Sequence, residues 1–316
     1  MAQQITHVTG AAGGQQRSRG TRQVDFALVD VFAQEPLSGN PLAVVPGADG
    51  LDDDDMRRIA REFNQSETTF LLHPTRDAEW RLRSFTAAGV EVDGAGHNAL
   101  GAWWWLAESG AIALDDGWAS FRQEIGDDVL EVEVLAEAGS PKAIAMWQGA
   151  PRHQTVLTDC AELASALGLT VSDLDVTHLR PQVVSTGVAH LMVPVRDRGA
   201  LARARPDALR LASVLRSCGA EGCYIFALAT SEPDTQAHTR FFNPTVGIAE
   251  DPATGTAAGP LACYLISNAV APAGRVAFIQ GEDMGRRSRI ELDVRGDAVR
   301  LLGSAVTVAV GKLRLP

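Results

Sequence analysis

Cysteine is scarce in this chain of 316 residues, which has four, at positions 160, 218, 223 and 263. No two of them are spaced as C-x-x-C, and the histidines form no HxxH or HxxxH pattern. Such spacings are typical of zinc sites and redox pairs. We therefore expect reduced, structural thiols in a cytoplasmic protein, and no metal.

Signals for nucleotides, nucleic acids and membranes are also missing. No G-x-G-x-x-G segment follows a strand-like run, and there is no Walker or G-x-S-x-G motif, so neither a nucleotide or flavin cofactor nor a serine hydrolase is indicated. No apolar run reaches the roughly 18 residues that a membrane-spanning helix needs. The net charge of -11 and the pI near 5.1 argue against nucleic acid or an anionic membrane as a partner.

The N-terminal 22 residues are rich in glycine and glutamine and lack the apolar segment of a signal peptide. We expect a flexible tail over residues 1–22. The whole chain is 46% apolar and 21% charged, as soluble globular proteins are. Its length allows one large domain or two ordinary ones, each with a core of its own.

After the tail, the sequence repeats itself once. Runs at 26–32, 42–46, 68–73 and 79–85 are typical of strands, and 51–63, with aspartates at its start, is typical of a helix. Similar segments return at offsets of 148, then about 156, then 159 positions. The matched pairs are Gly39 with Gly187, Val45 with Val193, Pro46 with Pro194, Gly96 with Gly255, His97 with Thr256, Trp105 with Tyr264 and Leu106 with Leu265. These matches indicate that one large unit is present twice. Repeats of solenoid proteins are far shorter.

Each unit contains one strongly apolar helix, at 97–109 and at about 256–269. A helix that is apolar around most of its circumference must be enclosed. We therefore predict an α+β fold of two pseudo-symmetric domains, each a curved, mostly antiparallel sheet or barrel around a central helix. The first domain takes residues 23–150 and the second 151–302. Two closing strands, in RIELDV and RLLGSAVTVAVGKLRL, are expected at the end, and the last, at about 303–316, returns to the first domain.

Both central helices begin at a glycine, in DGAGHNA (93–99) and DPATGTA (251–257). The free amides and the positive dipole end of a helix N-terminus attract anions, and glycine lets a ligand approach closely. Two such ends facing one cleft would bind a small carboxylate. The alternative is a simple turn before each helix.

Four side chains near these helix starts could carry chemistry. Glu67 opens an otherwise uncharged strand, and His97 follows the first glycine. Asp251 and Thr256 lie on either side of the second glycine. A carboxylate and a histidine in one cleft can act as general acid and base, above all if burial raises the pKa of the carboxylate. Each residue also has a structural explanation, as a strand end, a packed histidine or a helix cap, and Glu250 competes with Asp251 for the same role.

Several segments together resemble the PhzF family of phenazine-biosynthesis-type proteins. They are VDVFAQEPLSGNPLAVV, NQSETTFLL, GAGH, RFFNPTVGIAEDPATGTAAGPLACYL and QGEDMGRRSRIEL, and the resemblance extends over about residues 24–311. It implies the diaminopimelate epimerase fold, a homodimer, and an active site in the cleft between the two domains. It also implies a metal- and cofactor-independent isomerase of a small cyclic or unsaturated amino or hydroxy acid, with trans-2,3-dihydro-3-hydroxyanthranilate as the default substrate.

The same resemblance implies roles for individual residues. Glu67 would shuttle the proton, while His97 and Asp251 would position the substrate and assist catalysis. The implied substrate-binding residues are Ser66, Gly96, Gly255 and Thr256. Thr256 and the amides of the two glycines would hold the substrate carboxylate.

Three departures from the family pattern bear on specificity. Two-thiol epimerases of this fold have a cysteine just before each helix glycine, where this chain has Ala95 and Thr254, so that chemistry is excluded. Thr256 stands where serine is usual, and Asn98-Ala99 replaces a small residue followed by threonine. Two other functions stay open: a one-base epimerase or lyase in a biosynthetic pathway, and a non-catalytic ligand-binding protein on the same scaffold.

Overall fold

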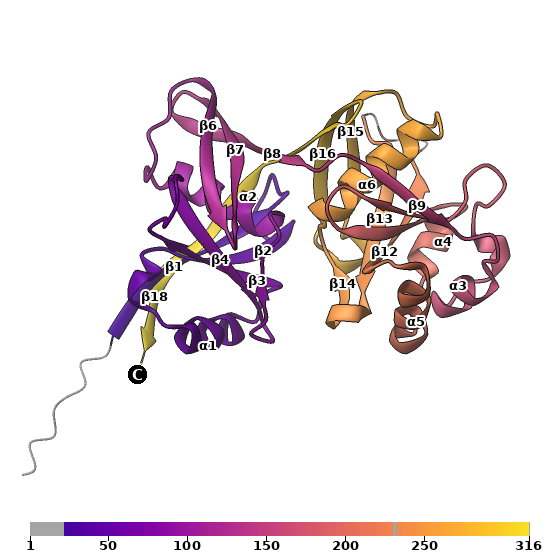
Figure 1. Cartoon of the computed structure of the whole chain (residues 1–316), viewed down its shortest axis with the longest axis horizontal. Coiled ribbons are helices and arrows are strands. Elements are labelled where there is room, and N and C mark those ends of the chain that lie inside the picture. Colours follow the sequence, from indigo (N-terminus) through magenta and orange to yellow (C-terminus); the bar gives the residue numbers. More distant parts are fainter. Residues whose placement is uncertain (1–21, 230–231, 233, 316) are drawn as a thin grey trace, which may run out of the picture.

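The computed structural model describes residues 22–229, 232 and 234–315. The chain forms two lobes that lie side by side (Figure 1). The predicted N-terminal tail falls outside the described residues, except for Arg22, where the first strand begins.

The first half is a curved sheet around one helix. Its strands are β1 (Arg22–Val31), β2 (Asn40–Val45), β3 (Glu67–Leu72), β4 (Trp80–Thr86), β5 (Glu91–Val92), β6 (Gly117–Ile125), β7 (Asp128–Glu137) and β8 (Ser140–Gln148). Its helices are α1 (Asp53–Phe63), α2 (His97–Glu108) and the short 3-10 helix η1 (Ala48–Gly50). The predicted strands and the helix at 51–63 are confirmed to within four residues at each end.

The second half has the same plan with more helices on its outside. Its strands are β9 (Arg152–Val156), β10 (Gln182–Ser185), β11 (Ala189–Pro194), β12 (Gly222–Leu228), β13 (Ala237–Asn243), β14 (Ile248–Asp251), β15 (Gly274–Gln280), β16 (Ser288–Arg295) and β17 (Ala298–Gly303). Its α-helices are α3 (Ala161–Ala166), α4 (Arg198–Arg203), α5 (Ala208–Cys218) and α6 (Gly255–Ser267), and its 3-10 helices are η2 (Val171–Asp173), η3 (Pro244–Val246) and η4 (Glu282–Met284).

The two central helices are enclosed as their composition predicts. In α2, Leu100, Trp103 and Leu106 have no exposed surface, and the helix packs against β1, β2, β3 and β8. In α6, Leu261 and Leu265 are equally buried, and the helix packs against β10, β11, β16 and β17. Each helix therefore has a fixed N-terminus, held by the sheet around it.

Strand pairing repeats between the halves. In the first half β2 pairs parallel with β3, β3 antiparallel with β4, and β4 parallel with β6. In the second half β11, β12, β13 and β15 repeat these three pairings in the same order. An outer ion pair repeats as well, because Arg83 donates two hydrogen bonds to Glu91 and Arg240 donates two to Glu250. The internal matches in the sequence thus correspond to equivalent places in the fold.

The end of the chain differs from the prediction, since it forms three strands rather than two. β16 and β17 pair with each other in the second half, and β18 (Ala305–Leu315) follows after Ser304. The segment predicted as one strand breaks at the point where the chain changes its partner strands: β17 pairs with β16 and β8, whereas β18 pairs along its length with β1 (Figure 1). The carbonyl of Ser304 accepts a hydrogen bond of 2.8 Å from the amide of Phe32 at this crossing.

The opposite crossing occurs after β8, because β9 pairs with β10 of the second half. At each crossing the chain thus passes from one half to the other: β9 follows β8 and joins the second half, and β18 follows β17 and joins the first. On this basis we propose a discontinuous first domain of residues 23–150 and about 303–316, and a second domain of residues 151–302.

Candidate active site

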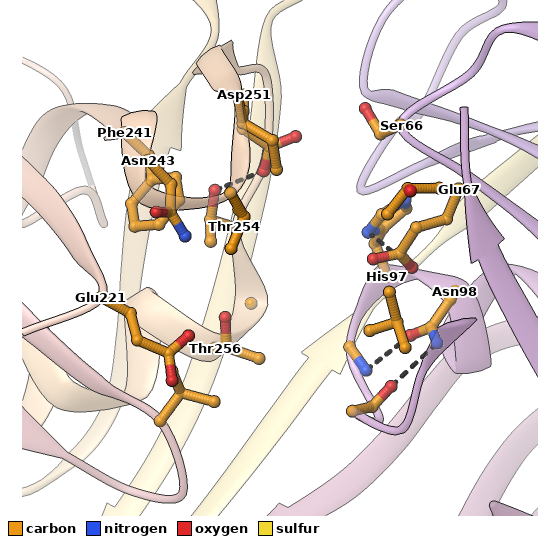
Figure 2. Close-up of a pocket in the computed structure, with 18 of the residues that line it drawn as sticks. Ser66, Glu67, His97, Asn98, Glu221, Phe241, Asn243, Asp251, Thr254 and Thr256 are labelled. Carbon is orange, nitrogen blue, oxygen red and sulfur yellow. Dashed lines mark hydrogen bonds and ion pairs between the residues drawn. The ribbon is translucent and has the colours of Figure 1, made fainter. Parts of the chain in front are cut away.

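A cavity of about 480 Å³ lies between the two halves (Figure 2). Its volume is within the range of small-molecule sites. The residues that line it include all seven predicted site residues: Ser66, Glu67, Gly96, His97, Asp251, Gly255 and Thr256. The first four belong to the first half and the last three to the second, so neither half contains the site alone.

The starts of α2 and α6 meet in this cavity. A Cβ atom placed on Gly96 would lie 3.6 Å from Cγ2 of Thr256, so the two helix ends are in contact range. On Gly255 a Cβ atom would lie 2.7 Å from the side chain of Leu301. A side chain at 255 would therefore displace Leu301 of β17, so glycine there serves packing as well as any approach of a ligand.

The amide of Gly96, which the sequence predicts to bind a substrate carboxylate, has a partner within the protein. It donates a hydrogen bond of 2.8 Å to the side-chain oxygen of Asn98. The amide nitrogen of the Asn98 side chain in turn donates to the carbonyl of Gly94 and to the hydroxyl of Ser84. Asn98 thus occupies the amide of Gly96, while the amides of Gly255 and Thr256 have no hydrogen-bond partner among the described residues.

Glu67 is the first residue of β3, and its side chain is only 18% exposed. Its Oε2 lies 3.9 Å from Nδ1 of His97 and has no hydrogen-bond partner among the described residues (Figure 2). Burial, and to a smaller extent the charge of Asp251, raises the pKa of Glu67 to about 8. A carboxyl group with this pKa can both release and accept a proton near neutral pH.

His97 opens α2 and faces Glu67. Burial lowers the pKa of His97 to about 4, so the imidazole is neutral at neutral pH. Its Nε2 is buried and has no hydrogen-bond partner among the described residues. The ring can therefore offer a hydrogen bond to a ligand in the cavity.

Asp251 is the last residue of β14 and is buried on the other side of the cavity. It accepts hydrogen bonds of 2.9 Å from the side chain of Asn40 and 2.5 Å from the hydroxyl of Thr254. Burial is the main cause that raises the pKa of Asp251 to about 6. Glu250 forms its ion pair with Arg240 instead, because neighbouring residues in a strand point to opposite faces. The expectation that Asp251 rather than Glu250 faces the site therefore agrees with this geometry.

A buried hydrogen-bond network fixes the turn between β14 and α6. The side chain of Gln280 donates to the carbonyl of Asp251 at 2.7 Å and to the hydroxyl of Thr254 at 3.0 Å. Its oxygen accepts from the hydroxyl of Tyr224 at 2.8 Å. A fully paired network of this kind holds the carboxylate of Asp251 in one position.

Sequence reasoning missed several residues of the site. Asn40 connects the halves, since its side chain also donates to the carbonyl of Ala253 at 2.9 Å. His190 and Phe241 line the cavity from the second half. Neither asparagine nor a single histidine outside a metal pattern carries a local signal, and only the position of Asn40 within the repeated segment could have indicated it.

The described residues contain no group of three or more histidine, cysteine, aspartate or glutamate side chains that could hold a metal ion. In the same part of the chain, no helix is long and apolar enough to cross a membrane. The four cysteines are free and buried.

Comparison with known sequences identifies relatives over almost the whole chain. The model of a family described as phenazine biosynthesis-like proteins matches residues 29–311. An uncharacterised isomerase of Clostridium acetobutylicum is 33% identical over 309 residues, which cover 93% of this chain and 99% of that protein. A trans-2,3-dihydro-3-hydroxyanthranilate isomerase of Pseudomonas aeruginosa is 33% identical over 298 residues, covering 92% and 99% of the two chains.

Solved structures agree with the sequence comparison. A PhzF-family phenazine biosynthesis protein of Bacillus anthracis has a TM-score of 0.83 at 29% identity, covering 92% of this chain and 99% of that one. A hydroxyproline epimerase of Agrobacterium vitis has a TM-score of 0.61 at 13% identity, covering 93% of both chains, and shares the fold alone. The predicted α+β, diaminopimelate epimerase-like fold is therefore confirmed.

Proposed function

Since this chain belongs to the phenazine biosynthesis-like family and is an isomerase, we propose that it moves a proton between two carbons of a small cyclic or unsaturated amino or hydroxy acid. The observation that carries this proposal is the buried carboxyl group of Glu67, whose pKa is raised to about 8 in the cavity between the halves. The first substrate to test is the compound named for the Pseudomonas relative, trans-2,3-dihydro-3-hydroxyanthranilate.

The pKa values of Glu67, Asp251 and His97 differ in a way that supports distinct roles. Glu67, with a pKa of about 8, is a stronger base than an ordinary carboxylate and becomes an acid once it holds the proton. Asp251, with a pKa of about 6, is largely ionised at neutral pH, and His97, at about 4, is neutral. We assign proton transfer to Glu67, and positioning of the substrate to His97 and Asp251.

In the proposed reaction, the Glu67 carboxylate removes a proton from one substrate carbon, and the electron pair of that C–H bond enters the unsaturated system. The double bond shifts, and the protonated Glu67 returns the same proton to a second carbon. Atoms and charge balance within the substrate, so the step needs no further reactant. The cavity between the halves limits the access of water to the proton while Glu67 holds it.

The substrate carboxylate is proposed to bind at the start of α6. The amides of Gly255 and Thr256 are the available donors there, since the amide of Gly96 is bonded to Asn98. The hydroxyl of Thr256 and the positive end of the helix dipole would add to this binding. Ser66, beside Glu67, would bind the substrate from the first half.

The test is incubation with trans-2,3-dihydro-3-hydroxyanthranilate that carries deuterium on the ring carbon that loses its hydrogen. We expect conversion with much of the deuterium retained in the product, because one carboxyl group both takes and returns the proton. Mass spectrometry of the product measures the retained label. Loss of all label to water would favour the one-base epimerase or lyase. No conversion at all would contradict this substrate and leave the isomerase assignment to be tested on related acids.

We further propose that the protein is a cytoplasmic homodimer, as the family resemblance implies. Free, buried cysteines are consistent with a reducing compartment. Light scattering after size-exclusion chromatography should give twice the mass of the 33.5 kDa chain, and a monomer mass would contradict the dimer.

A further inference from the structure

His190 is a buried polar residue of the cavity that the proposed proton transfer does not use. It lies on β11 in the second half and is only 2% exposed. It lines the cavity, and neither of its ring nitrogens has a hydrogen-bond partner among the described residues. Because buried polar atoms without partners destabilise a fold, an imidazole in this position calls for a partner that the protein itself does not supply.

The surroundings of His190 hold its ring in place. Phe241 meets the imidazole edge to face, with ring centroids 5.1 Å apart and an angle of 86°. Gly222 is paired with His190 on the neighbouring strand β12. A Cβ atom on Gly222 would lie 2.4 Å from the ring of Phe241 and 3.1 Å from Nδ1 of His190. The missing side chain at 222 thus leaves room for both rings, which pack against each other.

Burial lowers the pKa of His190 to about 3, so its ring is neutral at neutral pH. A neutral imidazole donates one hydrogen bond and accepts another, but has no charge with which to attract a carboxylate. Its natural partner is a group that can donate and accept, as a hydroxyl or an amine can. The carboxylate-binding donors, by contrast, lie at the start of α6.

We propose that His190 is a specificity-determining residue that hydrogen-bonds a hydroxyl or amino substituent of the substrate, on the wall of the cavity that Phe241 also forms. This inference rests on the proposed function in taking the cavity as the site of a small cyclic acid. Phe241 would contact the ring of that acid, while His190 distinguishes substituted from unsubstituted rings.

Isothermal titration with three stable ring acids tests this role: benzoate, anthranilate, which adds an amine, and 3-hydroxybenzoate, which adds a hydroxyl. We expect wild-type protein to bind at least one substituted acid about tenfold or more tightly than benzoate, the gain from one good hydrogen bond. In His190→Leu the ratio should fall close to one, with benzoate binding little changed. His190→Gln, which keeps a donor and an acceptor, should retain part of the preference. Tighter binding of anthranilate would indicate that His190 prefers an amine, and tighter binding of 3-hydroxybenzoate that it prefers a hydroxyl.

Thermal unfolding separates this role from a structural one. His190→Leu removes two unpartnered polar atoms from an apolar site, so its unfolding midpoint should equal or exceed that of the wild type. A clearly lower midpoint would mean that the imidazole supports the fold, and the inference would be wrong. An unchanged preference in His190→Leu would overturn the inference and leave the proposed function standing. Failure of all three acids to bind the wild type would contradict the proposed function itself, and this inference with it.

Discussion

The two halves of the molecule share one plan, yet they differ at the place where the first half carries its base. In β2 and β3, Leu42 pairs with Glu67; in β11 and β12, His190 pairs with Gly222. The registers are equivalent, because Val45 and its match Val193 lie three positions further along each parallel pair. Gly222 therefore occupies the place of Glu67 in the second half.

The second carboxylate of the site comes from a different place in the repeat. Asp251 precedes the glycine of α6 and lines the cavity. Asp93 precedes the glycine of α2, but it lies beside Gly126, where a Cβ atom would be 3.1 Å from its Oδ1. The comparison teaches that a duplicated fold can give an asymmetric site, because Glu67 of the first half and Asp251 of the second come from positions that are not equivalent. Burial raises the pKa of both acids, but hydrogen bonds from Thr254 and Asn40 lower the pKa of Asp251, whereas no such bond lowers that of Glu67. The resulting difference in pKa suits the two acids to different tasks.

The largest effect is expected at the base of the first half. Glu67→Gln keeps the size of the side chain but cannot take a proton, so turnover of the identified substrate should fall by about a thousandfold or more. Steady-state kinetics measures this, with Glu62→Gln on the exposed face of α1 as the control that stays near wild type. Near-normal turnover of Glu67→Gln would contradict the proposal that the first half supplies the base at this position.

A smaller loss is expected from the carboxylate of the second half. Asp251→Asn should lower kcat/KM by about a hundredfold, because it removes a positioning group and its hydrogen bonds. It should also lower the pKa of Glu67, since the charge of Asp251 helps to raise it. Because Glu67 must be ionised to take the proton, kcat/KM should rise with pH through the pKa of Glu67. The midpoint of this rise should therefore move to lower pH in Asp251→Asn, and the pH–rate profile measures the shift.

Glu250→Gln is the matched control for that experiment, because it changes the neighbouring carboxylate on the outer face. It weakens the pair with Arg240 and should affect stability more than the pH–rate profile. Equal shifts in the two variants would show that strand alternation does not separate their roles.

The third prediction concerns the place that lacks a side chain. Gly222→Ala puts a Cβ atom 2.4 Å from the ring of Phe241, so the ring must move, and we expect a loss of about 1–3 kcal/mol in the free energy of unfolding. Gly50→Ala, where nothing lies within 4 Å, is the control and should change stability by less than about 0.5 kcal/mol. Denaturant unfolding compares the two, and similar small effects would contradict tight packing around His190 and Phe241.

The smallest effect is a pH dependence of stability. The pKa of Glu67 is raised from 4.5 to about 8 in the folded state, so the folded protein binds the proton more tightly than the unfolded chain. Stability from this group is present below pH 4.5 and is lost as the pH rises through about 8. Between pH 6.5 and 8 the wild type should lose about 1–2 kcal/mol relative to Glu67→Gln.

His97 and His190 are present in both proteins, so their own change of charge on unfolding cancels when the wild type is compared with Glu67→Gln. Urea unfolding of both proteins at several pH values measures the difference. Parallel stability curves for the wild type and Glu67→Gln would mean that the carboxyl group of Glu67 is not held in the protonated form by its surroundings.

Local patterns in the sequence were sufficient for β1 to β4, α1, the two central helices and the candidate residues, whereas α3, α4 and α5 were not predicted. Strand alternation, the aspartates before α1 and the apolar composition of α2 and α6 depend only on neighbours along the chain. The glycine at each helix start and the carboxylates beside it could be recognised for the same reason, and the repeat related one half to the other. The break at Ser304 was missed because the change of partner strand, from β8 to β1, leaves no signal in the local sequence.

What the sequence by itself determined is part of the set of elements, their duplication and the residue types available for acid–base chemistry. Only the tertiary structure decided which groups share a cavity, that Asn98 occupies the amide of Gly96, and that His190 lies unpartnered beside Phe241. It also decided the charge states, since the pKa of Glu67 depends on burial by both halves and on Asp251 across the cavity. The physical reason is that propensity and alternation are local, whereas desolvation and hydrogen bonding depend on residues as far apart in the chain as Asn40 and Asp251, which are separated by 211 positions.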